Sequence, residues 1–148
     1  MDKTDIALLN ILQEDARITV SELSKKLMLS RPSVTERLHR LQEKGIIEGF
    51  SARVSPAAFG RNTMLIIQIS DLKIPAMQWE KMIVEERDVL ECHRVTGHIG
   101  YVIKAAVNGM DGLRALVDRL MNYSNYVNTS VILTSPVSYR PIVPTGEE

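Results

Sequence analysis

The run from Leu27 to Ile47 (LMLSRPSVTERLHRLQEKGII) has two chemically different faces at helical spacing. Val34, Leu38 and Leu41 recur at i, i+4 and i+7, which is the spacing of a buried helical stripe. The other side carries hydroxyls and cations: Ser33, Thr35, Arg37, Arg40 and Lys44. Such groups contact phosphates and base edges in the major groove, so this segment predicts a DNA-recognition helix.

Eight side chains on this helix and just before it are the candidate DNA contacts: Lys25, Ser30, Arg31, Ser33, Thr35, Arg37, Arg40 and Lys44. The arginines are long enough to reach guanine or the backbone, and the hydroxyls suit phosphates or base edges. Taken alone, such cations more often mark a solvated helix face, and the helix-turn-helix context favours DNA. We expect Glu36 and Glu43 to be helix-surface partners rather than DNA contacts.

The charge balance favours a DNA partner only locally. The chain of 148 residues has 18 Lys/Arg and 18 Asp/Glu, for a net charge of zero. Residues 25–53 nevertheless hold seven Lys/Arg against three Asp/Glu, a net charge of +4. DNA affinity depends on local neutralisation of phosphates, and this charge is weak for a monomer. We therefore expect two or more copies to bind together.

The other reactive side chains predict neither an active site nor a metal site. His39, His93 and His98 lack strong ligand spacing and no second cysteine joins Cys92, so no metal, cofactor or intrachain disulfide is expected. Cys92 and His93 adjoin in an expected strand and would point to opposite faces, which separates the thiol from a base. With no phosphate-binding glycine loop or nucleophile elbow, an enzyme is not expected.

The composition is that of an ordinary globular protein. Hydrophobic residues make up 45 % of the chain and charged residues 24 %. The polar N-terminus, Met1–Asp5, lacks the apolar stretch of a signal peptide, and no window approaches the ~20 apolar residues of a membrane span. We expect a cytoplasmic location and no membrane partner.

Local signals divide the first 50 residues into three helices. The apolar periodicity predicts a helix over Thr4–Glu14. Thr19 and Glu22 have the spacing of a capping box, which begins a second helix. Ser30 suits the N-cap of the recognition helix, and Gly45 is placed to end it.

The period then changes and predicts an α+β domain. A short strand or wing is expected over Glu48–Val54, followed by a hinge. Strand, helix, strand, strand, helix and strand are expected over residues 63–70, 75–87, 89–95, 101–107, 111–123 and 127–133. This βαββαβ order is the ferredoxin-like pattern, with two helices on one face of an antiparallel sheet. The strands alternate weakly, so both faces are expected to be buried, which favours dimerisation.

Short motifs along both domains resemble the Lrp/AsnC (feast/famine) family of prokaryotic transcription regulators. They are Asp2-Lys3-Thr4-Asp5, Asp15-Ala16-Arg17-Ile18, Leu29-Ser30, Arg37-Leu38 through Leu41, Glu43-Lys44-Gly45-Ile46-Ile47 and Val95-Thr96-Gly97. Each is short, but their order and spacing across nearly the whole chain make the match specific. The resemblance implies a winged helix-turn-helix, a hinge strand and a C-terminal regulatory domain of the regulation-of-amino-acid-metabolism type. It also implies homodimers that often assemble into octamers.

The same resemblance implies an effector site between dimers, for an amino acid or related small molecule. It assigns four residues to that site: Gly97, His98, Gly100 and Tyr101. Many family members have G-D-x-D-Y in this loop, whereas residues 97–101 here are Gly-His-Ile-Gly-Tyr. A carboxylate there could pair with a ligand's ammonium group. The absence of a carboxylate from this loop points to a different effector or to none.

We expect four segments: a winged helix-turn-helix domain (1–50), a hinge strand or linker (51–62), a ferredoxin-like oligomerisation and effector-binding domain (63–138) and an extended tail (139–148). The expected function is a sequence-specific transcription regulator that binds double-stranded DNA and associates with the nucleoid. One alternative is a low-specificity DNA-architectural protein. The other is a stand-alone small-molecule-binding or assembly module, because ferredoxin-like domains host many functions.

Overall fold

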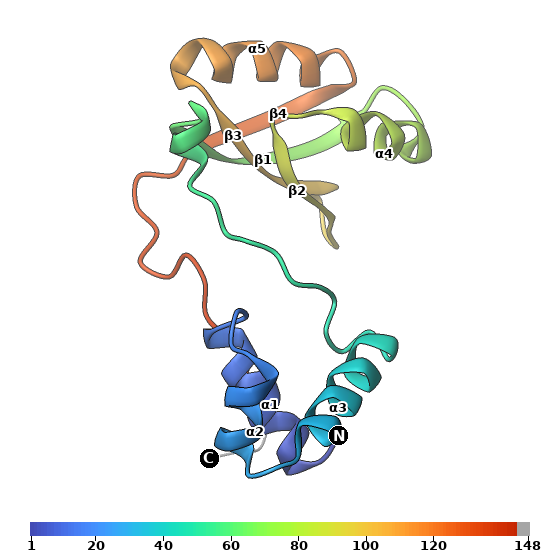
Figure 1. Ribbon diagram of the computed structural model, residues 1–148. Helices are drawn as coiled ribbons and strands as arrows, with labels where there is room; N and C mark the ends of the chain where they lie inside the picture. The colour runs from blue at the N-terminus through green and yellow to red at the C-terminus, as the bar shows by residue number, and fades with distance from the viewer. Residues whose placement is uncertain (145–148) are drawn as a thin grey trace. The chain divides into compact units, whose positions relative to one another are not determined.

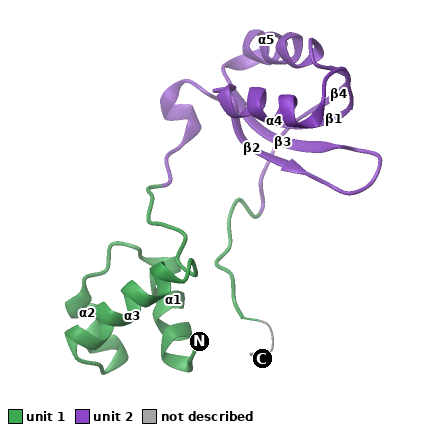
Figure 2. Cartoon of the chain, turned by 90° about the vertical axis from the view of Figure 1, so that its right-hand side faces the viewer, with its two compact units in different colours: residues 1–52, 137–148 green, residues 53–136 purple. Residues whose placement is uncertain are grey.

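The computed structural model describes residues 1–144, which form two compact units. Unit 1 contains Met1–Ala52 and residues 137–144, and unit 2 contains Arg53–Pro136 (Figure 2). The Gln13 side chain holds the tail within unit 1. It donates to the Ile142 carbonyl at 2.9 Å and accepts from the Ile142 N–H at 2.8 Å. The end of the tail expected over 139–148 lies outside the described residues.

Unit 1 begins with a three-helix helix-turn-helix, and the N-caps of its second and third helices are those that the sequence predicts. The helices are α1 (Lys3–Glu14), α2 (Val20–Leu27) and α3 (Arg31–Glu43) (Figure 1). Thr19 and Glu22 form the predicted capping box at the start of α2. Ser30 accepts a hydrogen bond from the Ser33 N–H, which confirms it as the N-cap of α3.

Gly45 ends α3 as predicted, in the left-handed conformation with φ of 66°. The Ile46 N–H donates to the Leu41 carbonyl at 2.9 Å, and the Gly45 N–H donates to the Gln42 carbonyl at 2.9 Å. This pair of bonds is the Schellman arrangement, which satisfies the last carbonyls of a helix. The buried core of unit 1 joins all three helices through Leu8, Leu12, Leu23, Val34 and Leu41.

The strand or wing predicted over Glu48–Val54 is wrong. These residues are irregular, and the next element is the short 3-10 helix η1, Pro56–Phe59. A strand is held by ladder hydrogen bonds to a neighbour, and no segment within residues 1–144 pairs with this one. The hinge strand expected within residues 51–62 is therefore a linker in the single chain.

Unit 2 has the predicted ferredoxin-like order βαββαβ. Its elements are β1 (Thr63–Leu72), α4 (Ala76–Glu85), β2 (Val89–Arg94), β3 (Tyr101–Val107), α5 (Gly109–Met121) and β4 (Ser124–Val131). The strands pair antiparallel in the order β2-β3-β1-β4. β4 begins at Ser124 rather than at the predicted Val127, because Ser124 already pairs with Leu72 of β1, and the buried Ser124 hydroxyl also donates to the carbonyl of Ser70.

Both helices of unit 2 cover the same face of the sheet. The core contains Leu65, Ile67, Ile69, Trp79, Ile83, Tyr101, Ile103, Ala105, Val107, Leu116 and Leu120. Of the intervening residues of β1 and β3, Met64, Ile66 and Val102 are half-buried, whereas Ala106 is fully buried. Within one chain, only one of the two faces expected to be buried is therefore covered.

We expect Gly45→Ala to lower the free energy of unfolding of unit 1 by about 1–2 kcal/mol, because a side chain strains the left-handed backbone. No atom lies within 4 Å of the added Cβ, so the cost is conformational rather than steric. Gly49→Ala is the matched control, since Gly49 is also in open space and its φ is not positive. Urea unfolding followed by circular dichroism measures both variants. Equal stability of the two would contradict this account of the helix end.

Candidate nucleic-acid interface

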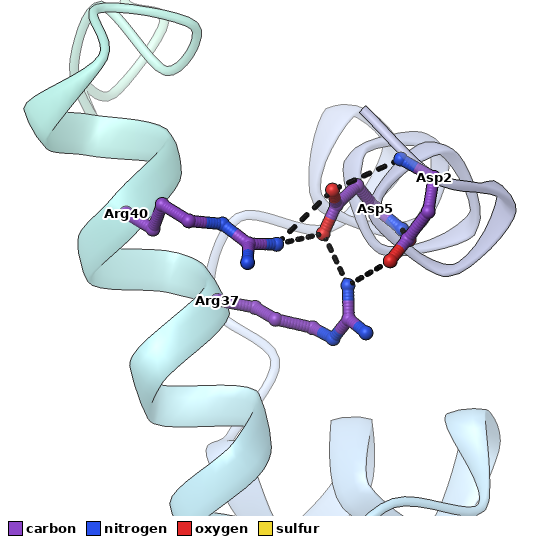
Figure 3. A network of polar contacts seen from close by, with 4 residues as sticks. All are labelled: Asp2, Asp5, Arg37 and Arg40. Carbon is purple, nitrogen blue, oxygen red and sulfur yellow. Dashed lines mark hydrogen bonds and ion pairs between the residues drawn. The ribbon is translucent and has the colours of Figure 1, made fainter.

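Two aspartates at the start of α1 and two arginines of α3 form one cluster of ion pairs (Figure 3). Nη1 of Arg37 donates to Oδ2 of Asp2 at 2.7 Å and to Oδ1 of Asp5 at 2.6 Å. Nη2 of Arg40 donates to Oδ1 and Oδ2 of Asp5 at 3.0 and 3.2 Å. Asp2 and Asp5 also form the capping box of α1. The cluster therefore ties the start of α1 to α3.

The environment of Asp5 makes these pairings necessary. Asp5 is only 3 % exposed, and this burial opposes ionisation of its carboxyl group. The Asp2 backbone N–H and the Arg37 guanidinium outweigh burial, so the pKa of Asp5 lies below its usual 3.8. The hydrogen bond from Arg37 also lowers the pKa of Asp2, and the two aspartates raise the pKa of Arg37. The cluster is therefore ionised at neutral pH.

Arg37 and Arg40, two of the three arginines predicted as DNA contacts, are thus engaged within the chain, to different degrees. The Arg37 side chain is 22 % exposed, and its Nη1 bonds both aspartates. The Arg40 side chain is 42 % exposed and bonds Asp5 through Nη2. Arg40 therefore keeps more surface for a second partner than Arg37 does.

The polar side chains at the start of α3 lie together. The hydroxyl oxygens of Ser30 and Ser33 are 2.9 Å apart. Nη2 of Arg31 donates to the hydroxyl of Ser21 at 3.0 Å. Hydroxyls, a guanidinium and the first N–H groups of a helix all favour an anion, so this corner can hold a DNA phosphate. Ser21 was not among the predicted contacts, and the signal for it is its place in the first turn of α2.

The other predicted contacts lie on α2 and farther along α3. Thr35 is exposed, and its hydroxyl donates to the Arg31 carbonyl at 3.0 Å. Lys25 is exposed on α2, and Lys44 is exposed at the C-cap of α3. The predicted set therefore follows the helix-turn-helix from α2 to the end of α3 and does not form one cluster.

The partners of Arg37 and Arg40, Asp2 and Asp5, were not predicted from the sequence. Asp2 and Asp5 are three residues apart, and so are Arg37 and Arg40. Residues three apart share one helix face, so each pair presents two like charges to one neighbour. Matching spacings of opposite charge on two helices of one bundle are the signal that could have found the cluster.

The loop between β2 and β3 contains three of the four predicted effector residues. Gly97 has φ of 106°, and both Gly97 and His98 are exposed. Gly100 closes the loop, because its N–H donates to the Ile69 carbonyl at 2.9 Å and its carbonyl accepts from the Val95 N–H at 3.0 Å. The loop is therefore a fixed turn that leaves the His98 imidazole accessible.

Tyr101, the fourth predicted effector residue, lies in the core of unit 2. It is 4 % exposed, and its ring centroid is 5.8 Å from that of Trp79. Its hydroxyl donates to Oε1 of Glu80 at 2.8 Å, and Glu80 is also 3.8 Å from Nη1 of Arg94. Burial and then Glu80 raise the pKa of Tyr101. Glu80 thus places a carboxylate beside both residues that flank the loop.

The described residues hold no further candidate centre. Within residues 1–144, no group of three or more His, Cys, Asp or Glu side chains is arranged to bind a metal ion. Burial raises the pKa of the Cys92 thiol, which keeps it protonated at neutral pH. No helix in this part of the chain has the length and apolar character needed to cross a bilayer.

Both units of the chain are similar to known protein families. Residues 1–48 match the family described as winged helix-turn-helix DNA-binding, and residues 67–142 match the Lrp/AsnC ligand binding domain. An uncharacterized HTH-type transcriptional regulator of Bacillus subtilis is 32 % identical over 91 % of this chain and 95 % of its own length. The leucine-responsive regulatory protein of Escherichia coli is 32 % identical over 79 % of this chain and 73 % of its own.

Solved structures share the fold. A feast or famine regulatory protein from M. tuberculosis, complexed with L-methionine, has a TM-score of 0.88 and 29 % identity, covering 97 % of this chain and 99 % of its own. A transcriptional regulator from Neisseria meningitidis, in complex with L-Met, has a TM-score of 0.86 and 26 % identity, covering 96 % of each chain. The predicted fold, an N-terminal helix-turn-helix and a C-terminal ferredoxin-like domain, is confirmed.

Acid is expected to destabilise unit 1 through Asp2 and Asp5. Their pKa values in the folded state are below 3.8, so their stabilising charges are present above about pH 4 and are lost as the pH falls through the folded values. Asp5→Asn removes the carboxylate at every pH. We expect this substitution to lower the free energy of unfolding at pH 7 by roughly 1–3 kcal/mol. We also expect the free energy of unfolding to fall less between pH 7 and pH 3 than it does in the wild type.

Urea unfolding at pH 7 and pH 3 measures both effects. Glu14→Gln is the control, because Glu14 is an exposed carboxylate on the same helix. An Asp5→Asn variant as stable as wild type at pH 7 would show that the cluster does not hold α1 to α3.

Proposed function

This chain belongs to the Lrp/AsnC family of transcriptional regulators, and we propose that it inserts α3 into the major groove of a specific operator. The observation that carries the proposal is the capped helix-turn-helix, whose start of α3 combines hydroxyls with Arg31. In this motif the N-terminal residues of the second helix contact base edges. The cluster of Arg37 and Arg40 with α1 supports the angle at which α3 is presented.

The predicted contacts are proposed to act in distinct ways. Ser30, Arg31 and Ser33 bind a phosphate together with Ser21 at the start of α3. Lys25 and Lys44 add backbone contacts at the two ends of the motif, and Arg40 adds one through its exposed side. Thr35 meets base edges. Arg37 acts through α1, by positioning the recognition helix.

We propose that the uncovered sheet face of unit 2 binds the same face of a second copy. Met64, Ile66 and Val102 leave apolar surface on that face, and dimerisation would remove it from water. Two helix-turn-helix units then contact half-sites ~10 bp apart, or a multiple of that distance. In this scheme residues 1–50 form the DNA-binding domain, and residues 51–62 link it to the second domain. Residues 63–138 form the domain that mediates oligomerisation and binds the effector, and residues 139–148 are the tail. The regulator acts in the cytoplasm, at the nucleoid.

A small-molecule effector is proposed to bind at residues 97–100, where His98 is accessible. The match to the Lrp/AsnC ligand binding domain supports this site, as do the two similar structures that hold L-methionine. The loop itself lacks a carboxylate for an ammonium group. Glu80, beside Arg94 and Tyr101, is the nearby group that could replace it.

A fluorescence-anisotropy titration tests the regulator directly. The probes are the gene's own upstream region and a scrambled duplex, each at two salt concentrations. We expect tighter binding to the upstream probe, weakening with salt. Lys25→Ala should weaken binding to both probes alike and reduce the slope of log K against log salt by about 1 for each subunit bound, whereas Lys81→Ala on α4 should change neither quantity. Equal binding to both probes would favour the architectural alternative, and no binding at low salt would contradict DNA regulation.

Sedimentation velocity tests effector control of assembly. Across a panel of amino acids and related metabolites, we expect at least one to shift the sedimentation coefficient, because an effector must prefer one assembly to change it. His98→Ala should reduce that shift, while Lys81→Ala, exposed on α4, should preserve it. Sedimentation that does not change across the panel would count against amino-acid control.

A further inference from the structure

The exposed side of α3 differs from the cationic face that its sequence suggests. The exposed residues of the helix are Arg31, Pro32, Thr35, Glu36, His39, Gln42 and Glu43. Arg37 and Arg40, by contrast, are held against α1 by Asp2 and Asp5. Toward solvent, α3 therefore presents two carboxylates beyond its first turn.

Glu36 does not form the ion pair that its position along the helix would allow. Arg40 follows Glu36 by four residues, which is the spacing at which Glu and Arg pair along a helix. Arg40 bonds Asp5 instead, at 3.0 Å, and no cation within residues 1–144 pairs with Glu36. The helix-surface pairing expected for Glu36 is thus absent, and its carboxylate is available to an external donor.

Glu36 also lies in the part of α3 that meets base edges. It is the sixth residue of Arg31–Glu43, one turn after the exposed Pro32. Glu43, the other exposed carboxylate, is the last residue of the helix, about two turns farther on. Because helix-turn-helix proteins contact bases with the N-terminal residues of this helix, Glu36 is the carboxylate in position to reach them.

A carboxylate in the major groove discriminates among bases by accepting hydrogen bonds and never donating them. Cytosine presents only its N4 amino donor there, whereas guanine presents the acceptors N7 and O6, and thymine presents the acceptor O4. Adenine presents a donor beside the N7 acceptor. An anion among phosphates that finds no donor is disfavoured, so a wrong base is actively rejected.

Building on the proposed insertion of α3, we propose that Glu36 is a specificity-determining residue of this regulator. Its carboxylate accepts a hydrogen bond from the N4 amino group of one cytosine in each half-site. The same charge weakens binding to DNA that lacks this cytosine. Glu36 therefore contributes to selectivity rather than to overall affinity.

Selection of binding sites from a random duplex library tests the proposal. Wild type should enrich cytosine at one fixed position of each half-site. Glu36→Gln should move that preference toward adenine, because glutamine pairs with adenine N6 and N7. Glu36→Ala should lose it and bind scrambled DNA more tightly. The ratio of operator to scrambled affinity should fall about 5- to 150-fold in Glu36→Ala, and Glu43→Gln should leave it unchanged.

Circular dichroism of each variant checks that it is folded, which the exposure of Glu36 leads us to expect. A wild type that enriches a sequence, with the same preference in both Glu36 variants, overturns the inference and leaves the proposed function standing. A wild type that binds DNA but enriches no sequence overturns both.

Discussion

The burial of one charged carboxylate, Asp5, is the constraint on which the geometry of the helix-turn-helix depends. An ion that is 3 % exposed needs close partners of opposite charge, and both partners come from α3. The bonds that satisfy Asp5 also fix α3 against the start of α1. They determine which side of the recognition helix faces solvent, since Arg37 and Arg40 turn toward α1 and Glu36 is left without a partner.

The same cluster changes the electrostatic argument for DNA binding. Arg37 and Arg40 supply part of the +4 charge of residues 25–53, but Asp2 and Asp5, outside that window, pair with them. The charge left to neutralise phosphates is smaller than the local count suggests. This smaller charge supports the proposal that two copies bind DNA together, for which the uncovered sheet of unit 2 offers a surface. In this account, selectivity among DNA sequences comes from hydroxyl groups and the Glu36 carboxylate on α3.

Features set by neighbouring residues could be predicted from the sequence. The caps at Thr19, Ser30 and Gly45 are confirmed because each is decided within one turn of the chain. The bounds predicted for β3, Tyr101–Val107, match the structure because this mainly apolar run, which contains only Lys104 as a charged residue, is bounded by Gly100 and Asn108. Features set by residues far apart in the sequence could not be predicted in this way. The strand over Glu48–Val54 failed because it depends on a neighbour that the pattern does not reveal.

In the candidate site, too, locally determined features could be predicted and long-range contacts could not. Periodicity separates the polar and apolar sides of α3, but it does not show that Arg37 meets Asp5, 32 residues away. The family resemblance assigns Tyr101 to the effector loop, whereas strand alternation places its ring in the core with Ile103 and Ala105. Hydroxyl clusters such as Ser30 with Ser33 follow from local spacing, whereas the bond from Arg31 to Ser21 needs the packing of two helices.

The most direct test is the distance between Arg37 Nη1 and the Asp5 carboxylate in a crystal structure of the protein bound to its operator. We predict that the bond persists at close to its length in the free chain, 2.6 Å, with Thr35 and Glu36 at the base edges. An Arg37 that leaves Asp5 to bond a guanine would contradict the claim that this arginine positions the recognition helix.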